Sequence, residues 1–167
     1  KNGTDGNLQI VFDAIKSGSG AHHFLSVTKE GNSAIFSTSG NMYCHTILRG
    51  GAKKVNYDEK SIEEVSARLD KANLPQQIVV DCSHANSMKD HKKQLDVIND
   101  VAKQLSKGES RIRGLMIESN LVEGNQNIND INLIYGKSVT DSCIGWEDTE
   151  KSLSILSEAI EKRKSNA

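Results

Sequence analysis

Apolar residues along the 167-residue chain follow two alternating patterns. Four segments place apolar side chains three or four positions apart, which predicts helices; they are residues 8–15, 62–72, 95–105 and 153–160. Four others are rich in β-branched and aromatic residues, which predicts strands: "HHFLSVT" from His22, "CHTILRGG" from Cys44, "QQIVVDCS" from Gln76 and "IRGLMIES" from Ile112. The chain therefore reads as a repeated strand–helix unit.

This order predicts an α/β fold in which about four parallel strands carry helices on their outer side. Four such units correspond to about half of a (β/α)8 TIM barrel, which usually has about 250 residues. A doubly wound open sheet is the alternative, but no strand leads into a GxGxxG or GxxxxGK[ST] motif. Residues 30–41 separate two predicted strands where a helix would be expected, and they favour a small hairpin insert. We expect residues 1–167 to form one domain.

Composition excludes several classes of protein. The chain has 21 basic and 22 acidic residues without long runs of either sign, which argues against a nucleic-acid or anionic-membrane surface. No apolar stretch approaches the length of a membrane-spanning helix. Three cysteines without CxxC spacing favour reduced thiols and a cytoplasmic protein. Because the sequence starts at Lys1 and not at methionine, we expect it to be part of a longer chain.

Polar residues gather at the predicted strand ends. In a parallel barrel the chemistry lies at the carboxyl ends of the strands. Arg49, His84 and Glu118 each end or follow a predicted strand, and Asp141 lies in the loop before the last helix. Lys1 would end a strand that precedes the given sequence. We expect these five side chains to face one rim.

Each of these residues also has a simpler interpretation. Lys1 can be a solvated terminus, Arg49 a surface residue at a turn, His84 a hydrogen-bonded structural histidine and Asp141 a helix cap. Glu118 is harder to explain in this way, because it directly follows three apolar residues. A partly buried carboxylate needs a cation or several donors. The convergence of all five favours a functional site.

The residue types indicate the chemistry of that site. Histidine, glutamate and aspartate from separate strand ends can surround one divalent metal ion with nitrogen and oxygen ligands. Arg49 precedes two glycines, and its guanidinium can bind two oxygens of a phosphate or carboxylate at once. Lys1 would add a point charge. A metal beside an anion pocket indicates chemistry on a phosphorylated small molecule.

Longer motifs carry a family resemblance. At "KNGTDG", "ILRGG", "DCSHANS", "MIESNLVEGNQ" and "YGKSVTDSCIGWEDT" the chain resembles the type I 3-deoxy-D-arabino-heptulosonate 7-phosphate (DAHP) synthases, also called phospho-2-dehydro-3-deoxyheptonate aldolases. The motifs occur in the order of that family and cover nearly the whole chain. The related octulosonate phosphate synthases fit them much less well. The resemblance implies the C-terminal half of a TIM barrel.

The resemblance also implies an activity and roles for residues. The family opens the shikimate pathway to aromatic amino acids by condensing phosphoenolpyruvate with erythrose 4-phosphate, which gives DAHP and phosphate. His84, Glu118 and Asp141 would bind one divalent metal ion (Mn, Fe, Co or Zn). Lys1 and Arg49 would hold phosphoenolpyruvate, and together with His84 they would be the catalytic residues.

Other residues are assigned from the same motifs. Asp81, Ser83 and Asn86 are candidates for orienting the imidazole of His84. The cysteine ligand of the family belongs to the first half of the barrel, so we interpret Cys82 and Cys143 as ordinary buried thiols.

Regulation is implied as well. Ser26 lies where the family binds its aromatic amino-acid inhibitor, and serine there resembles the phenylalanine-sensitive forms. A homo-oligomer, either a dimer or a tetramer, is expected. Two alternatives remain at this point: a catalytically inactive fragment or regulatory module, and another metal-dependent barrel aldolase. We expect the 167 residues alone to be inactive.

Overall fold

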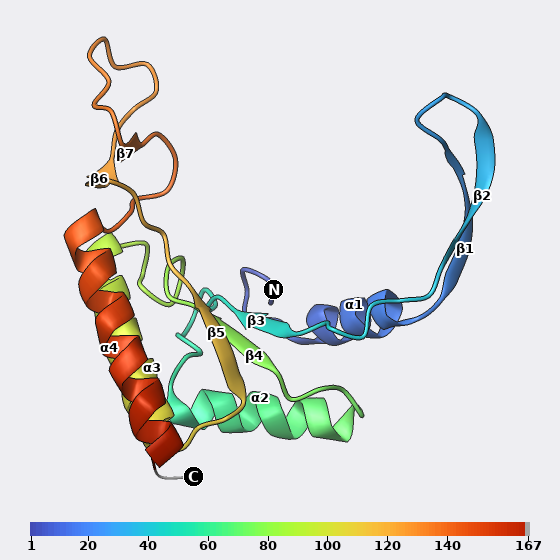
Figure 1. Ribbon diagram of the computed structural model, residues 1–167, viewed down its shortest axis with the longest axis horizontal. Coiled ribbons are helices and arrows are strands. Elements are labelled where there is room, and N and C mark those ends of the chain that lie inside the picture. The colour runs from blue at the N-terminus through green and yellow to red at the C-terminus, as the bar shows by residue number, and fades with distance from the viewer. Residues whose placement is uncertain (166–167) are drawn as a thin grey trace.

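A parallel three-stranded sheet forms the centre of the computed structural model, which describes residues 1–165 (Figure 1). Its strands run in the order β3 (Thr46–Leu48), β4 (Ile78–Asp81) and β5 (Ile112–Met116), and each pairs in parallel with its neighbour. The connecting helices are α2 (Glu59–Lys71) between β3 and β4, and α3 (Gln94–Ser106) between β4 and β5. A 3-10 turn, η1 (His91–Lys93), leads into α3, and α4 (Trp146–Ser165) lies beside α3 (Figure 1). The predicted α/β class is confirmed.

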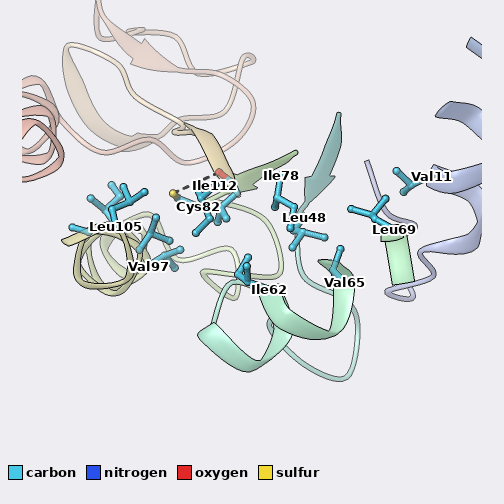
Figure 2. Packing of buried hydrophobic residues seen from close by; sticks show 14 of the residues in the cluster. Val11, Leu48, Ile62, Val65, Leu69, Ile78, Cys82, Val97, Leu105 and Ile112 are labelled. Carbon is cyan, nitrogen blue, oxygen red and sulfur yellow. Dashed lines mark hydrogen bonds between the residues drawn. The ribbon is translucent and has the colours of Figure 1, made fainter. Parts of the chain in front are cut away.

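The sheet has one buried and one partly exposed face. Leu48, Ile78 and Val80 are fully buried in a core with α2 and α3, to which Ile62 and Val97 contribute (Figure 2). On the other face, alternate positions such as Ile47 and Val79 are only half-buried, and Met116 is 39% exposed. Parallel sheets are normally covered on both faces. Within residues 1–165 the second face lacks such a cover.

All four predicted helices are present. The first, α1 (Gln9–Ser19), buries Val11, Phe12 and Ile15, as its apolar spacing predicts. The apolar stripe predicted for α4 is only partly right, because Leu153 is 55% exposed. The residues that α4 buries are small, namely Thr149, Ser152 and Ala159.

The segment from His22 is not a strand of the parallel sheet, which corrects the prediction of about four parallel strands. It forms β1 (His22–Val27), which pairs antiparallel with β2 (Ser33–Thr38) in a hairpin that stands away from the sheet (Figure 1). The hairpin predicted for residues 30–41 exists, but β1 supplies its other strand. A left-handed glycine, Gly31 at φ 83°, and the bond from the Thr28 N–H to the Asn32 carbonyl close the turn.

A second small pair lies in the polar segment after β5. Here β6 (Val122–Asn125) and β7 (Lys137–Ser138) pair in parallel, where the sequence indicated only a loop. A single parallel bridge between Ser119 and Ile144 places the start of α4 beside the end of β5. Among the described helices, none is both long and apolar enough to cross a membrane.

Candidate active site

Three acidic or imidazole side chains meet at the carboxyl end of the sheet. His84 follows β4, Glu118 follows β5, and Asp141 precedes α4. One ligating atom from each lies within 4.8 Å of the others. They line a pocket of about 40 Å³ together with Ser83, Ser87, Lys89, His91 and Ser142. The structure therefore brings together the three residues that the sequence singled out as ligands.

Strand pairing explains this convergence. Asp81 of β4 lies opposite Met116 of β5, so the segments that carry His84 and Glu118 leave the sheet at the same level. The third segment is held by Ile144, whose N–H donates to the Glu118 carbonyl at 2.9 Å. Asp141 thereby reaches the pocket although it comes from an irregular loop.

His84 is oriented by its two neighbours in the predicted motif. Its Nδ1 lies 2.9 Å from Oδ2 of Asp81 and 2.7 Å from Oγ of Ser83. The Ser83 hydroxyl donates to the other carboxylate oxygen of Asp81 at 2.7 Å, so it can accept a hydrogen bond from Nδ1. These contacts favour the tautomer with the proton on Nδ1, which leaves the Nε2 lone pair for a metal.

Asp81 connects this histidine to Lys1. Burial of the Asp81 carboxyl, which is 1% exposed, opposes ionisation. Hydrogen bonds from Lys1, Ser83 and His84 outweigh burial and hold the pKa of Asp81 below its ordinary value. Lys1 Nζ lies 2.8 Å from Oδ2, so the ammonium is held by the same carboxylate oxygen that contacts His84. At neutral pH Asp81 is therefore a carboxylate shared by a cation and an imidazole.

Arg49 lies half-buried just after β3, and buried asparagines hold its main chain. The Arg49 N–H donates to Oδ1 of Asn2 at 2.8 Å, and the next N–H, that of Gly50, donates to Oδ1 of Asn56 at 2.7 Å. Asn2 is placed by its own N–H, which donates to the Ile47 carbonyl at 3.1 Å. The side chains of Lys1 and Arg49 consequently start from neighbouring positions at the same end of the sheet.

Asn86 completes this network, and its role differs from the one predicted. We expected it to orient the imidazole, but its amide donates to the carbonyls of Leu48 at 3.1 Å and Asp81 at 2.9 Å. Gly50, at φ 74°, packs closely on the loop that carries Asn86. A Cβ at this position would lie 2.7 Å from the main-chain nitrogen of Asn86. Asn86 therefore fixes the ends of β3 and β4 and the turn after Arg49.

The cluster does not include Ser26, Cys82 or Cys143. Ser26 is in β1, opposite Ala34 in the hairpin. Cys82 is fully buried in the hydrophobic core, and that burial raises the pKa of its thiol. Cys143 is also buried and free. Sequence reasoning missed Asn2 and Asn56, because no local signal marks either of them as a partner of the Arg49 or Gly50 N–H.

The donor set suits a divalent transition metal. One imidazole and two carboxylates form a mixed nitrogen and oxygen site of the kind that Mn, Fe, Co and Zn accept. Atoms bound to one ion at about 2.0–2.2 Å lie no more than about 4.4 Å apart. The mutual spacing within 4.8 Å lies slightly above that limit, so small side-chain movements would let the three residues hold one ion.

Comparison with known proteins agrees with this α/β fold. Residues 1–154 match the DAHP synthetase I family, and the chain belongs to that family. It is 54% identical over 165 residues to the Phe-sensitive phospho-2-dehydro-3-deoxyheptonate aldolase of Escherichia coli K12, covering 98% of this chain and 47% of that protein. The Trp-sensitive aldolase of Enterobacter agglomerans is 48% identical over 164 residues, with 98% and 47% covered.

A solved structure is also similar. The phospho-2-dehydro-3-deoxyheptonate aldolase of Francisella tularensis SCHU S4 superposes with a TM-score of 0.91 at 48% identity, covering 97% of this chain and 47% of that one. The chain thus spans about half the length of the relatives it matches.

Proposed function

We propose that the chain is the C-terminal half of the (β/α)8 barrel of a DAHP synthase. This enzyme would condense phosphoenolpyruvate with erythrose 4-phosphate to DAHP and phosphate, the first step of the shikimate pathway. The observation that carries the proposal is the cluster of His84, Glu118 and Asp141 in a member of this family. The half-covered sheet and the match to 47% of longer relatives support a barrel completed by other residues.

The anion pocket would hold phosphoenolpyruvate. Arg49 offers a planar fork of donors to a phosphate or carboxylate, and its fixed main chain limits where that fork can reach. Lys1 adds a positive charge, and its bond to Asp81 sets it beside the metal ligands. Two cations on adjacent segments match a substrate that carries both a carboxylate and a phosphate.

The cluster would bind the second reactant. An ion held by His84, Glu118 and Asp141 would supply a Lewis acid that orients and polarises the aldehyde of erythrose 4-phosphate. Carbon 3 of phosphoenolpyruvate then bonds to the aldehyde carbon. Water adds at carbon 2, and the C–O bond to phosphate breaks. The contacts of Asp81 and Ser83 with Nδ1 of His84 would keep Nε2 available throughout.

The rest of the site would come from outside these residues. The family resemblance implies a cysteine ligand and further phosphate-binding Arg and Lys residues from the first half of the barrel. We therefore expect the 167 residues alone to be inactive. A cytoplasmic homo-oligomer, a dimer or tetramer, is part of the same proposal.

We propose phenylalanine as the inhibitor, bound in a pocket that includes Ser26. Similar proteins are named as Phe-sensitive and as Trp-sensitive, so inhibitor choice varies among relatives. The hairpin joins the sheet at the amino end of β3, whereas Arg49 follows the opposite end of that strand. Phe24, Leu25 and Ile35 are exposed on the hairpin, so it has apolar surface for an amino-acid ring or a second subunit.

The test is phosphate release from phosphoenolpyruvate by the complete protein that contains this chain. Release that depends on both erythrose 4-phosphate and a divalent metal would support the proposal. Its absence in a folded, metal-loaded protein would favour the inactive or regulatory alternative. Release with a different aldehyde only would indicate another barrel aldolase.

Arg49→Lys supplies a sharper test within the same protein. Lysine keeps the charge but loses the two-pronged donor geometry. We expect the Michaelis constant for phosphoenolpyruvate to rise more than that for erythrose 4-phosphate. Equal changes in both constants would assign Arg49 a general structural role.

A further inference from the structure

A buried glutamine side chain bonds to the main chain of Glu118, one of the three clustered residues. Gln94 is the first residue of α3 and has 0% exposure. Its Nε2 donates to the Glu118 carbonyl at 3.1 Å, and its Oε1 accepts from the Glu118 N–H at 2.9 Å. The side chain therefore bonds to both main-chain groups of Glu118, as a neighbouring strand would do.

The position of Glu118 explains why such a partner is needed. The last bond between β4 and the β5 segment runs from the Cys82 N–H to the Met116 carbonyl at 2.9 Å. Beyond it the chain after β4 turns into the His84 loop and no longer pairs with the segment after β5. The main chain of Glu118 would be left without a partner on that side. The Gln94 side chain supplies the hydrogen bonds that β4 would have made if it continued.

The Glu118 carbonyl accepts a second hydrogen bond. The Ile144 N–H donates to the same Glu118 carbonyl at 2.9 Å. The peptide is thus held between α3 and the segment that follows Asp141. These three bonds restrict the position of the Glu118 Cα, and this in turn restricts where its carboxylate can reach.

A buried amide at this place needs a reason. Burying an amide is unfavourable unless its hydrogen bonds are made, and a leucine could fill a similar volume without that requirement. Among the described residues, both hydrogen bonds of the Gln94 side-chain amide go to Glu118, and neither goes to its own helix. The residue is therefore suited to fixing Glu118 and not merely to filling the core.

We infer that Gln94 is a positioning residue for Glu118 and sets the geometry and affinity of the metal site. The inference rests on the proposed function, because it takes Glu118 as a metal ligand. Residues that orient metal ligands commonly change metal affinity by about 10–100-fold when they are replaced. We expect an effect of that size although Gln94 does not touch the ion itself.

The chain offers a matched control on the same helix. Gln104 is also buried, at 5% exposure, and its Nε2 donates to the Tyr57 carbonyl at 2.9 Å and to Asp100 at 2.6 Å. Neither partner belongs to the cluster. Gln94→Leu and Gln104→Leu each remove one buried amide from α3, so the loss of fold stability should be similar in the two variants.

The experiment compares the two variants with the parent in the complete protein. Mn²⁺ affinity is measured by competition with a chelator, and the visible spectrum of the Co²⁺-loaded protein reports ligand geometry. We expect Gln94→Leu to weaken Mn²⁺ binding by about 10–100-fold and to alter the Co²⁺ spectrum. Gln104→Leu should leave both unchanged. Gln94→Met, which keeps an unbranched side chain of similar length, replaces Gln94→Leu if the latter does not fold.

The outcomes separate this inference from the proposed function. If the parent binds neither ion, the proposed function fails, and the inference fails with it. If the parent binds metal and releases phosphate, but the Gln94 variants keep its affinity and spectrum, the inference alone is overturned. Equal loss of affinity in the Gln94 and Gln104 variants would also overturn it, because a general loss of stability would then explain both.

Discussion

Replacing Asn86 by alanine should weaken both the fold and the anion pocket. The Asn86 side chain is 3% exposed. Its amide nitrogen donates to the carbonyls of Leu48 and Asp81, and its oxygen accepts from the Asn56 N–H at 2.9 Å. One side chain thus ties β3, β4 and the loop after Arg49 together, and alanine removes all three bonds.

The magnitude follows from the partners that remain. Each buried polar group left without a partner costs about 1–3 kcal/mol. Three such groups set an upper bound of about 9 kcal/mol, but water that enters the vacated space would satisfy some of them. We expect a loss of about 3–5 kcal/mol, a large share of the roughly 5–15 kcal/mol that stabilises a typical protein.

Urea denaturation of the complete protein measures this loss. Asn99→Ala is the control, because Asn99 is exposed and its amide donates only to the Leu95 carbonyl within its own helix. We expect that control to change stability by less than about 1 kcal/mol. Asn86→Ala should also raise the Michaelis constant for phosphoenolpyruvate, because Arg49 loses part of its support. A stability change for Asn86→Ala as small as that of the control would refute the reasoning.

Three further predictions concern other parts of the chain. Asp81→Asn should weaken metal binding by about 10–100-fold in a chelator competition, because Nδ1 of His84 loses a charged acceptor; parent-like affinity would contradict this. Ser26→Gly should relieve inhibition by phenylalanine and leave the uninhibited rate nearly unchanged, and dose–response curves with phenylalanine, tyrosine and tryptophan decide this. Hydrogen bonds from Arg111 hold the pKa of Glu109 in the folded protein below its ordinary value of 4.5. The ionised carboxylate therefore stabilises the fold above pH 4.5, and this stabilisation is lost as the pH falls through the lowered pKa of the folded state. Glu109→Gln should therefore lower the free energy of unfolding at neutral pH, and this effect should disappear at acidic pH. Urea denaturation of parent and variant at neutral and at acidic pH measures it; a difference in stability that does not change with pH would contradict the prediction.

The helices and the parallel strands were predictable because each has its own periodic pattern. Residues of α1 at helical spacing are the ones it buries, and the β-branched run of β4 is a central strand. The hairpin was misassigned because His22–Val27 has the composition of a strand whichever partner it takes. Antiparallel pairing with β2 depends on the turn after Thr28, and the residues of β1 alone do not predict that turn.

In the site, the residues that could be found are those that a strand delivers to the rim. His84 and Glu118 lie within three residues of the ends of β4 and β5, so locating the strand ends in the sequence was sufficient to find them. The supporting amides could not be found in this way. Asn2 and Gln94 bond to main-chain groups of Arg49 and Glu118, which lie 47 and 24 positions away, and nothing local in the sequence encodes such pairs.

The contacts of two buried residues, Asp81 and Gln94, also separate the two proposed functions of the site. Oδ2 of Asp81 lies 2.8 Å from Lys1 Nζ and 2.9 Å from His84 Nδ1, so one carboxylate supports both the anion pocket and the metal cluster. Gln94 bonds only to the main chain of Glu118, on the metal side. Replacing Gln94 should therefore change metal affinity more than substrate binding, whereas replacing Asp81 should change both. Because these residues lie on different elements and touch different groups, a general loss of folding would not reproduce that pattern.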